Sequence, residues 1–519
     1  GLARVTQACI DLSKITEVTQ DEDNNYQPDL EPYENMYVMI GGDAHIIEQY
    51  QLARFNEIRL AAGDRPVQFT QINTPNAAAY ELYRKSVGAR SIVYDDGLNE
   101  QNASISTLDG FANYAEATAP RMGDTVTDLQ GVLDYQWAGN AASPATWRVR
   151  SHRDGTNTFT RTNPRPGSAP QIAGNVRIAS FNVLNYFTTL DASGVTTAQG
   201  GDPRGADNAT ELTRQQAKLV NAIVDMNADV FGLVELENEF DDNRNGSTAI
   251  AVLVRAVNTA LQNDGKADRY DYVYPGHNSV GNDVIAVALI YNTATIGLAT
   301  GASPAILNDV EAKKLTAFQS HDFTADPVFT GNATNRASLA MTFEHTATGR
   351  SFTVSVNHFK SKGPSGLSTS SDPNYDAQDG AGFWNARRLK AAEIVTAWLD
   401  TDPSGVAGSL TVLLGDINAY AKEAPIQYIT NNGYSNFEVA GAYSYVFDGQ
   451  IGTLDYGFYK IEESSHVSFA GGEVWHINAD EASALDYNTD FGRLTSYFDA
   501  DTAIRSSDHD PLIGGFTFR

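Results

Sequence analysis

Short stretches of apolar residues, several of them alternating with polar residues, recur through the first third of the chain. They lie at residues 37–40, 56–60, 67–70, 91–94, 125–133 and 147–150, and turn-forming residues separate them. Alternation with a period of two is typical of half-buried β-strands. Several short strands interrupted by turns predict a small barrel or sandwich over residues 33–153.

The pattern changes after residues 154–174, a stretch rich in Thr, Asn, Pro and Gly that predicts a linker. Beyond it, apolar residues at helical spacing predict helices at 214–226, 249–261 and 384–399. Apolar runs predict strands at 176–181, 229–234, 284–291, 338–343, 352–356 and 410–414. Strands mixed with crossover helices predict an α/β sandwich with sheets inside and helices outside. The expected organisation is a β domain at 1–153, the linker at 154–174 and an α/β domain at 175–519.

Composition supports a folded chain of more than one domain. The 519 residues exceed what one ordinary core accommodates, and 42% are hydrophobic while 19% are charged. No run of about 18 apolar residues occurs, so we expect no membrane-spanning segment. The sequence starts with Gly1 rather than Met, which predicts a processed or trimmed fragment of a longer precursor. The single cysteine, Cys9, leaves the cellular compartment open.

The net charge of −28 argues against nucleic-acid binding, because proteins that bind nucleic acid are usually basic. A metal ion and a local basic cluster would make nucleic-acid binding compatible with this net charge, since both supply a positive field at one site. The chain also lacks a G-x-S-x-G elbow, a P-loop and zinc-type Cys/His spacing. The sequence therefore does not support a serine hydrolase with a covalent intermediate or a nucleotide-hydrolysing P-loop enzyme.

Polar residues of a restricted kind follow the predicted strands. They are Asn182, Glu235, His358, Asp416, Asn418, Asp455, Asp508 and His509. Folds of the α/β class place their sites at the carboxyl ends of strands. Each residue alone also fits a turn or a helix cap. Together they supply oxygen ligands for a hard divalent cation and two imidazoles for proton transfer.

Six segments resemble the motifs of the endonuclease/exonuclease/phosphatase superfamily, in the same order. They are RIASFNVLNYF (177–187), VFGLVELEN (230–238), SVNHFKSKG (355–363), LLGDINAY (413–420), TLDYGFY (453–459) and SSDHDPL (506–512). The phrases NVLNYF, RGAD (204–207), NHFKSKG and GFWN (382–385) resemble those of the bacterial extracellular nucleases in it. This resemblance implies a DNase I-like four-layer α/β sandwich.

The β-rich region also resembles a domain that precedes such nucleases. The phrases PYENMYV (32–38) and IVYDDG (92–97) are similar to those of an OB-fold-like barrel. OB folds commonly bind single strands through aromatic stacking and a basic groove. The region has aromatic residues but no strong basic stripe, so a spacer or docking module remains an equal alternative.

The resemblance implies a metal site. Glu235 would be the principal ligand of Mg²⁺ or Mn²⁺, assisted by Asn182 and Asp508. Glu237 would lie outside the coordination shell, because Glu235 falls directly at the strand end.

The resemblance also implies how protons move during phosphodiester hydrolysis. Asp416 would position the attacking water, and Asn418 would donate to a phosphoryl oxygen. His509 would take the proton from water, with Asp455 fixing its tautomer. His358 would bind the phosphate or protonate the leaving oxygen, and which histidine is acid and which is base stays open.

Substrate contacts are expected from Lys360, Arg336 and Asn185, which lie in or near the motif segments. Further basic residues in this region, Lys362, Arg387, Arg388 and Lys390, fit a phosphate-contacting surface and fit solvated surface charges equally well.

Two acidic loops fit structural Ca²⁺. In the first, Asp241, Asn243 and Asn245 match the first half of an EF-hand loop, but Val252 stands where the terminal Glu should be. The second contains Asp372, Asp376 and Asp379. Plain solvated turns are the alternative for both.

The sequence thus predicts a monomeric, metal-dependent nuclease, secreted or at the cell surface, that hydrolyses DNA, with RNA as an alternative substrate. Two other hypotheses stay open. The same fold could act on another phosphoester, such as an inositol phosphate, a sphingolipid headgroup or a phosphomonoester. A non-catalytic nucleic-acid-binding protein is the third, although intact Glu235, His358, Asp416 and His509 argue against it.

Overall fold

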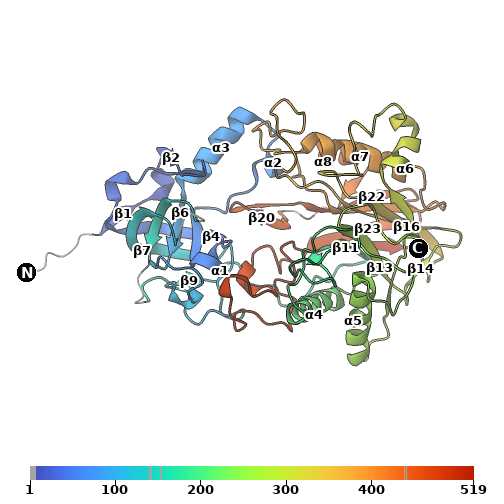
Figure 1. Cartoon of the computed structure of the whole chain (residues 1–519), viewed down its shortest axis with the longest axis horizontal. Helices are drawn as coiled ribbons and strands as arrows, with labels where there is room; N and C mark the ends of the chain where they lie inside the picture. Colours follow the sequence, from blue (N-terminus) through green and yellow to red (C-terminus); the bar gives the residue numbers. More distant parts are fainter. Residues whose placement is uncertain (1–6, 140–142, 152–154, 438, 440) are drawn as a thin grey trace, which may run out of the picture.

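The structure is a computed structural model that describes residues 7–139, 143–151, 155–437, 439 and 441–519. It shows a mixed α/β protein with a β-rich lobe formed by the first part of the chain and an α/β lobe formed by the rest (Figure 1). Among the described residues, no helix is long and apolar enough to cross a bilayer.

The β-rich lobe is built on strands that pair in a closed ring. The ring runs β4 (Tyr37–Glu48), β5 (Glu57–Ala62), β6 (Ser91–Asp95), β8 (Thr146–Arg150), β7 (Thr125–Gln136) and back to β4. The β6–β8 pair is parallel and the others are antiparallel. Short strands β1 (Ala8–Ile10) and β9 (Phe159–Thr160) add to β4 and β7. The ring encloses its own apolar core, which includes Leu60 and Leu129.

Shorter elements decorate this barrel. They are the hairpin β2 (Val18–Gln20)–β3 (Tyr26–Pro28), α1 (Leu52–Phe55), α2 (Phe69–Ile72) and α3 (Ala77–Ala89). The strand predicted at 67–70 is wrong, because Phe69 begins α2 and only Val67 keeps a single bridge, to Ile451. The Phe69 ring instead packs against Tyr80 and Tyr83 of α3, and the Thr70 hydroxyl donates to Glu423 of the α/β lobe.

Two sheets pack face to face in the α/β lobe. The first has the order β12 (Tyr270–Tyr272), β13 (Ile285–Asn292), β11 (Val230–Glu237), β10 (Val176–Tyr186), β24 (Leu512–Phe518), β23 (Val467–Val474). The second has the order β14 (Ile296–Leu298), β16 (Ser338–His345), β17 (Arg350–His358), β18 (Leu410–Asp416), β22 (Asp455–Ile461), β19 (Ser435–Asn436), and β15 (Ala305–Leu307) pairs with β16. Gly232 of β11 allows the close approach, because a Cβ there would lie 3.1 Å from Leu414 and Val356 of the facing sheet.

Helices cover the outer faces of this sandwich. Helices α4 (Ala209–Met226) and α5 (Ala249–Asn263) pack on the first sheet, and their apolar residues join the central core. Helices α7 (Asn385–Leu399) and α8 (Ala424–Asn431) pack on the second sheet and form a separate cluster with α6 (Asp309–Lys314). Figure 1 shows the two helix pairs on opposite sides of the sheets.

The lobes share apolar and ionic contacts. Ala482, Ala484, Leu485 and Tyr497, which lie between β23 and β24 in sequence, belong to the apolar core of the barrel. The Tyr497 hydroxyl accepts a hydrogen bond from the Ile105 amide at 3.1 Å. Part of the α/β half of the sequence therefore completes the core of the other lobe.

A buried ion cluster reinforces this junction. Asp480 pairs with Arg65 at 2.6 Å and with Arg121 at 3.4 Å, and its side chain has no exposed surface. Glu481 is equally buried and pairs with Arg121 at 3.0 Å and Arg165 at 2.6 Å. Because Arg165 belongs to the segment predicted as a linker, that segment is anchored between the lobes.

Candidate active site

Three polar residues from separate strands form one row across the second sheet. His358 ends β17, Asp416 ends β18 and Asp455 begins β22. Strand register pairs His358 directly with Asp416, and Asp416 directly with Asp455. The residues are 2–3% exposed. Gly415 makes this row possible, because a Cβ at its φ of +130° would lie 1.9 Å from the Asn357 carbonyl oxygen of β17.

His509 joins the row through Asp455. Its Nδ1 lies 2.7 Å from Asp455 Oδ2, which also accepts a hydrogen bond from the Ser444 hydroxyl at 2.7 Å. The Tyr445 ring stacks on the imidazole, with centroids 4.4 Å apart. Burial acts to lower the pKa of His509, but Asp455 and Asp508 outweigh it and raise that pKa well above its usual value. Asp455 therefore holds the ring by Nδ1 and leaves Nε2 as the nitrogen that can exchange a proton.

Asp416 is oriented by Asn418. The Asn418 backbone N–H donates to Asp416 Oδ1 at 2.9 Å, and the Asn418 amide donates to Oδ2 at 3.0 Å. The same amide nitrogen donates to the Phe359 carbonyl at 3.1 Å, so both of its protons are engaged. Burial and the nearby Asp455 raise the pKa of Asp416 to about 8. Donation from Asn418 to a phosphoryl oxygen would require one of these bonds to be exchanged.

His358 lies among charged groups. Its Nε2 is 3.6 Å from Asp416 Oδ2, 3.9 Å from Glu235 Oε1 and 3.4 Å from Arg336 Nη1. Burial lowers the pKa of His358 well below its usual value, and the charge of Arg336 lowers it further. Asp283 fixes Arg336, with 3.0 Å between Arg336 Nε and Asp283 Oδ2.

Glu235 projects from an irregular point in β11. The pairing of β11 with β13 shifts register between Leu233 and Leu236, and Glu235 has a φ of +68°. A left-handed conformation at a residue other than glycine costs of order 1–3 kcal/mol, and such strain clusters at functional sites. Glu237, by contrast, is buried and accepts hydrogen bonds from Thr188 and the Thr189 amide. The bulge thus directs one glutamate toward His358 and leaves the other to hold a loop.

Asn182, Glu235 and Asp508 offer only oxygen donors from carboxylate and amide groups. Burial raises the pKa of Glu235, and the negative charge of Asp508 raises it further. Asn182 lies opposite Val234 in the sheet, one residue from Glu235. Its Oδ1 accepts the Leu184 amide hydrogen bond at 3.0 Å, and a hydrogen bond from its side chain lowers the pKa of Glu235. The described parts of the chain contain no group of three or more His, Cys, Asp or Glu side chains arranged around one metal position. The donor set fits a hard cation with few protein ligands, as Mg²⁺ prefers.

Replacing Glu235 with glutamine is expected to weaken Mn²⁺ binding by at least about tenfold, because loss of even an outer-shell partner costs 10–100-fold in metal affinity. Titration calorimetry with Mn²⁺ measures this without any substrate. Glu239→Gln, a partly exposed glutamate four residues away, is the matched control. Equal Mn²⁺ affinity in the two variants would contradict the assignment of Glu235 as a ligand.

The residues expected to contact substrate have different surroundings. Lys360 is buried beside the row, and burial together with Arg336 lowers its pKa to about 8. Asn185 has a φ of +50° and its carbonyl accepts a hydrogen bond from Gln215, but no hydrogen bond or ion pair within the described residues connects its side chain with the row. The structure thus brings Lys360 and Arg336 to His358 and leaves Asn185 apart.

The remaining basic residues are engaged elsewhere. Arg388 has no exposed side-chain surface and donates to the Lys360, Phe383 and Ala381 carbonyls, so its prediction as a surface residue is wrong. Lys362 pairs with buried Glu423 at 2.6 Å. Arg387 and Lys390 pair with Asp326 and Glu393.

The calcium candidates form turns. Asp241 Oδ1 accepts the Asn243 amide hydrogen bond, and Asn243 Oδ1 accepts that of Asn245, both at 3.1 Å. In the second loop, Asp372, Asp376 and Asp379 each accept the amide hydrogen bond of the residue two positions on. Such turns need no ion, and the calcium sites stay untested predictions.

Sequence reasoning missed several supporting residues. Ser444 and Tyr445 contact the Asp455–His509 pair, Asn478 donates to the His509 carbonyl at 2.7 Å, and Asp283 holds Arg336. None follows a predicted strand. Only Asp283 could have been found from the sequence, because it lies directly before the strand predicted at 284–291.

Comparison with known proteins gives remote similarity. No family model matches the chain, and no curated protein matches it. Solved structures that it resembles include an endonuclease/exonuclease/phosphatase family protein from Bacteroides thetaiotaomicron, with 15% identity, a TM-score of 0.39, and coverage of 66% of this chain and 98% of the other. The human Nocturnin catalytic domain with bound sulfate shows 15% identity, a TM-score of 0.37, and coverage of 67% and 97%. A mannosyl-6-phosphatase from Bacteroides thetaiotaomicron shows 14% identity, a TM-score of 0.39, and coverage of 66% and 100%.

Proposed function

We propose that this protein is a secreted, divalent-metal-dependent nuclease that hydrolyses phosphodiester bonds of DNA, with RNA as an alternative substrate. One observation carries the proposal. The Asp455–His509 pair, at 2.7 Å, stands in the same row as Asp416 and His358, and His358 Nε2 lies 3.9 Å from Glu235. Groups for proton transfer and oxygen donors for a cation therefore meet at one edge of the sandwich. The six motif segments supply these same residues.

The proposed chemistry is attack of water on the scissile phosphorus while the P–O bond to the leaving sugar oxygen breaks. The leaving oxygen takes up a proton from His358 or from solvent water. Asp416, held by Asn418, orients the water. The neutral form of His509, whose Nδ1 proton is held by Asp455, accepts the proton of the water at Nε2. Asp455 fixes the imidazole tautomer through Nδ1 and stabilises the imidazolium that forms. Mg²⁺ or Mn²⁺ bound by Glu235, with Asn182 and Asp508, would offset charge on the phosphate oxygens.

The phosphate itself needs a positive surface, which the chain provides locally despite its net charge of −28. Arg204, Arg336 and Lys360 all lie close enough to His358 to lower its pKa. His358 and these cations are the proposed contacts to the non-bridging oxygens, as electrostatic stabilisation of a phosphoryl group requires.

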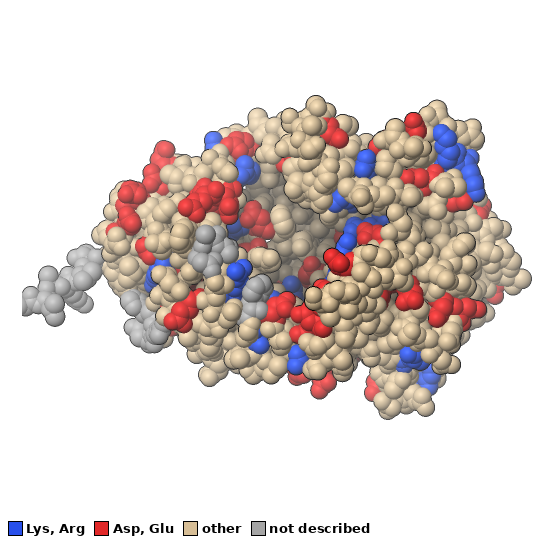
Figure 2. Space-filling view, in the orientation of Figure 1, with Lys and Arg blue, Asp and Glu red and all other residues tan. Residues whose placement is uncertain are grey.

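The barrel is proposed to be an OB-like module beside this site. The closed ring β4-β5-β6-β8-β7, with its one parallel pair β6–β8, supports that assignment. Figure 2 shows a hollow between the two lobes, with basic and acidic side chains at its rim. A strand of nucleic acid that enters the hollow would lie between the barrel and the sandwich.

Plasmid cleavage by the purified protein tests the proposal. We expect cleavage with Mg²⁺ or Mn²⁺, none with EDTA, and nicked and linear intermediates if the enzyme cuts internally. Linear and single-stranded DNA and RNA would be tested in parallel. Failure on all of them, with hydrolysis of a phosphomonoester or a phospholipid headgroup, would overturn the nuclease assignment in favour of another phosphoester. Secretion is tested separately, by locating the native protein in culture medium, on the cell surface or in cells.

A further inference from the structure

A two-stranded hairpin connects the barrel with the candidate active site. It comprises β20 (Tyr445–Phe447) and β21 (Gln450–Gly452), with Asp448 and Gly449 at its tip. Figure 1 shows β20 reaching from the α/β lobe toward the barrel. An isolated two-stranded hairpin is marginally stable at best in water, so its position depends on what it contacts at each end.

The base of the hairpin touches both members of the Asp455–His509 pair. The Ser444 hydroxyl donates to Asp455 Oδ2, the same oxygen that faces His509 Nδ1, and accepts the amide hydrogen bonds of Leu454 and Asp455 at 3.0 Å. Tyr445, the next residue, stacks its ring on His509 with an interplanar angle of 29°. Two consecutive residues thus fix the carboxylate and the imidazole that it orients.

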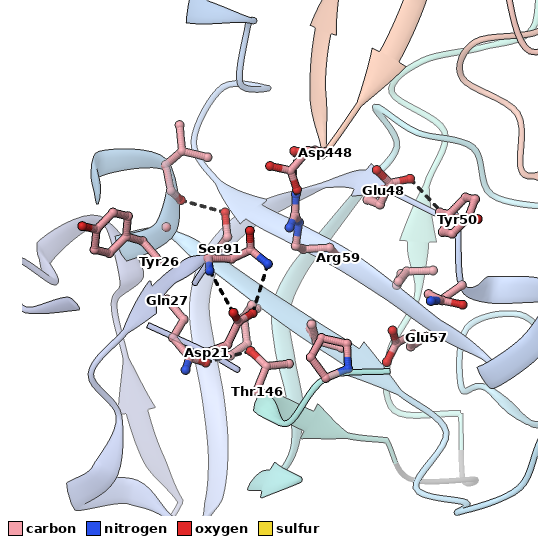
Figure 3. A pocket seen from close by; sticks show the side chains of 18 of the residues that line it. Asp21, Tyr26, Gln27, Glu48, Tyr50, Glu57, Arg59, Ser91, Thr146 and Asp448 are labelled. Carbon is pink, nitrogen blue, oxygen red and sulfur yellow. Dashed lines mark hydrogen bonds and ion pairs between the residues drawn. The ribbon is translucent and has the colours of Figure 1, made fainter. Parts of the chain in front are cut away.

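The tip of the hairpin is held by strands of the barrel. Arg59 of β5 donates to the Asp448 carbonyl at 2.5 Å and pairs with its carboxylate at 2.6 Å. Glu48 of β4 accepts the Gly449 amide hydrogen bond at 3.1 Å. Gly449 packs so closely that a Cβ there would lie 2.8 Å from Ile47 and 2.9 Å from Arg59. Figure 3 shows Arg59 directed at Asp448, at the edge of a cavity of about 700 Å³ between barrel and hairpin.

The edge of the hairpin is paired as well. The Gln68 amide donates to the Ile451 carbonyl, and the Ile451 amide donates to the Pro66 carbonyl, both at 2.9 Å. The Gln68 side chain donates to the Phe447 carbonyl at 2.8 Å. Residues 66–68, which leave the barrel after β5, therefore run beside β21 and form a single parallel β-bridge with it, between Val67 and Ile451.

We propose that Ser444 and Tyr445 are positioning residues for the Asp455–His509 pair, and that the barrel sets their position through the hairpin. This inference rests on the proposed function, because it assigns the barrel a part in catalysis besides any contact with nucleic acid. The barrel then acts on the turnover number rather than on substrate affinity. Loosening the hairpin tip lets the imidazole leave the orientation that the proton transfer needs, and small misplacements of reacting groups reduce rates strongly.

The first test is the isosteric variant Asp448→Asn. Asparagine tolerates the left-handed conformation found at Asp448, with φ +50°, so the change removes the charge and preserves the backbone. We expect kcat for DNA cleavage to fall about fivefold with KM changed less than twofold. Asp134→Asn, which removes one of the two carboxylate partners of Arg150 inside the barrel, is the control. Equal kcat in Asp448→Asn and Asp134→Asn would overturn the inference.

The base of the hairpin gives a second comparison. Tyr445→Leu is expected to lower kcat about tenfold, and Tyr445→Phe, which keeps the stacked ring, should recover most of that loss. If the hairpin transmits the effect of the barrel, Asp448→Asn should add little in the Tyr445→Leu background. If the effects of Asp448→Asn and Tyr445→Leu on kcat are fully additive, the hairpin tip does not act through Tyr445.

Hydrogen exchange separates failure of this inference from failure of the proposed function. Amides of residues 444–452 should exchange faster in Asp448→Asn than in Asp134→Asn, whether or not the protein cleaves DNA. Unchanged exchange there would overturn the coupling. A wild-type protein that is inactive on every nucleic acid would instead overturn the proposed function, and the exchange result would still decide whether the barrel holds the hairpin.

Discussion

Replacing His509 with alanine is expected to lower the rate of DNA cleavage by about 10²–10⁴-fold, the range that general acid–base catalysis contributes. The physical reason is the geometry of one nitrogen. Asp455 holds Nδ1 at 2.7 Å, so Nε2 is the proton acceptor, and alanine removes it altogether. The metal site and the cations around His358 remain, which is why some rate above the uncatalysed reaction should persist.

Initial rates on supercoiled plasmid at saturating Mg²⁺ measure this effect, and the melting temperature shows whether folding is preserved. His466→Ala is a suitable control, because His466 is partly exposed and its side chain pairs only with the exposed Glu463 among the described residues. A His509→Ala protein that retains a tenth or more of the wild-type rate would rule out His509 as the base.

Replacing Asp480 with asparagine is expected to destabilise the protein by about 3–5 kcal/mol, the usual cost of removing one partner from a buried ion pair. Arg65 is 14% exposed and Arg121 is 2% exposed, so neither guanidinium can recover full solvation when the carboxylate is lost. The free energy of unfolding from urea titrations at pH 7 measures the effect. Asp400→Asn, whose carboxylate is 58% exposed and pairs with Lys460, should cost less than about 1 kcal/mol.

The difference in unfolding free energy between wild type and Asp480→Asn should depend on pH. Burial acts to raise the pKa of Asp480, but Arg65 and Arg121 outweigh it and hold that pKa at about 2, below the ordinary value of 3.8. A lowered pKa contributes stability above the ordinary value, and this contribution is lost as the pH falls toward 2. The gap in stability between wild type and Asp480→Asn should therefore narrow between about pH 4 and pH 2. A constant gap would contradict the role assigned to this carboxylate.

Periodicity predicted the regular elements of the α/β lobe closely. The helix predicted at 249–261 is α5, Ala249–Asn263, and the strand predicted at 410–414 is β18, Leu410–Asp416. Strand ends then located His358 and Asp416, since the parallel strands β17 and β18 bring their carboxyl ends to one edge. Asn182 and Glu235 instead lie within β10 and β11, and Asp455 begins β22. What periodicity could not supply was register, and register is what pairs His358 with Asp416 and Asp416 with Asp455.

Features without periodicity were not predictable in the same way. Strands β20 and β21 have three residues each, too few to show an alternating pattern, so the hairpin and Ser444 went unnoticed. Residues 67–70 alternate in sequence like a strand, but their burial does not alternate: the consecutive residues Phe69 and Thr70 are both buried, Phe69 against Tyr80 and Tyr83. The pairing of Arg65 with Asp480 joins residues 415 positions apart, and no local pattern specifies such a contact.

The insertion of Ala482, Leu485 and Tyr497 into the core of the barrel bears on how such a chain can evolve. Recombination within residues 154–174 would exchange the barrel but leave behind the apolar residues that fill it and the acidic pair that neutralises its arginines. The core of a barrel from another protein would not pack well against Ala482, Leu485 and Tyr497. The two lobes are therefore expected to be inherited and to diverge together, with substitutions on one side matched by substitutions near residues 480–497.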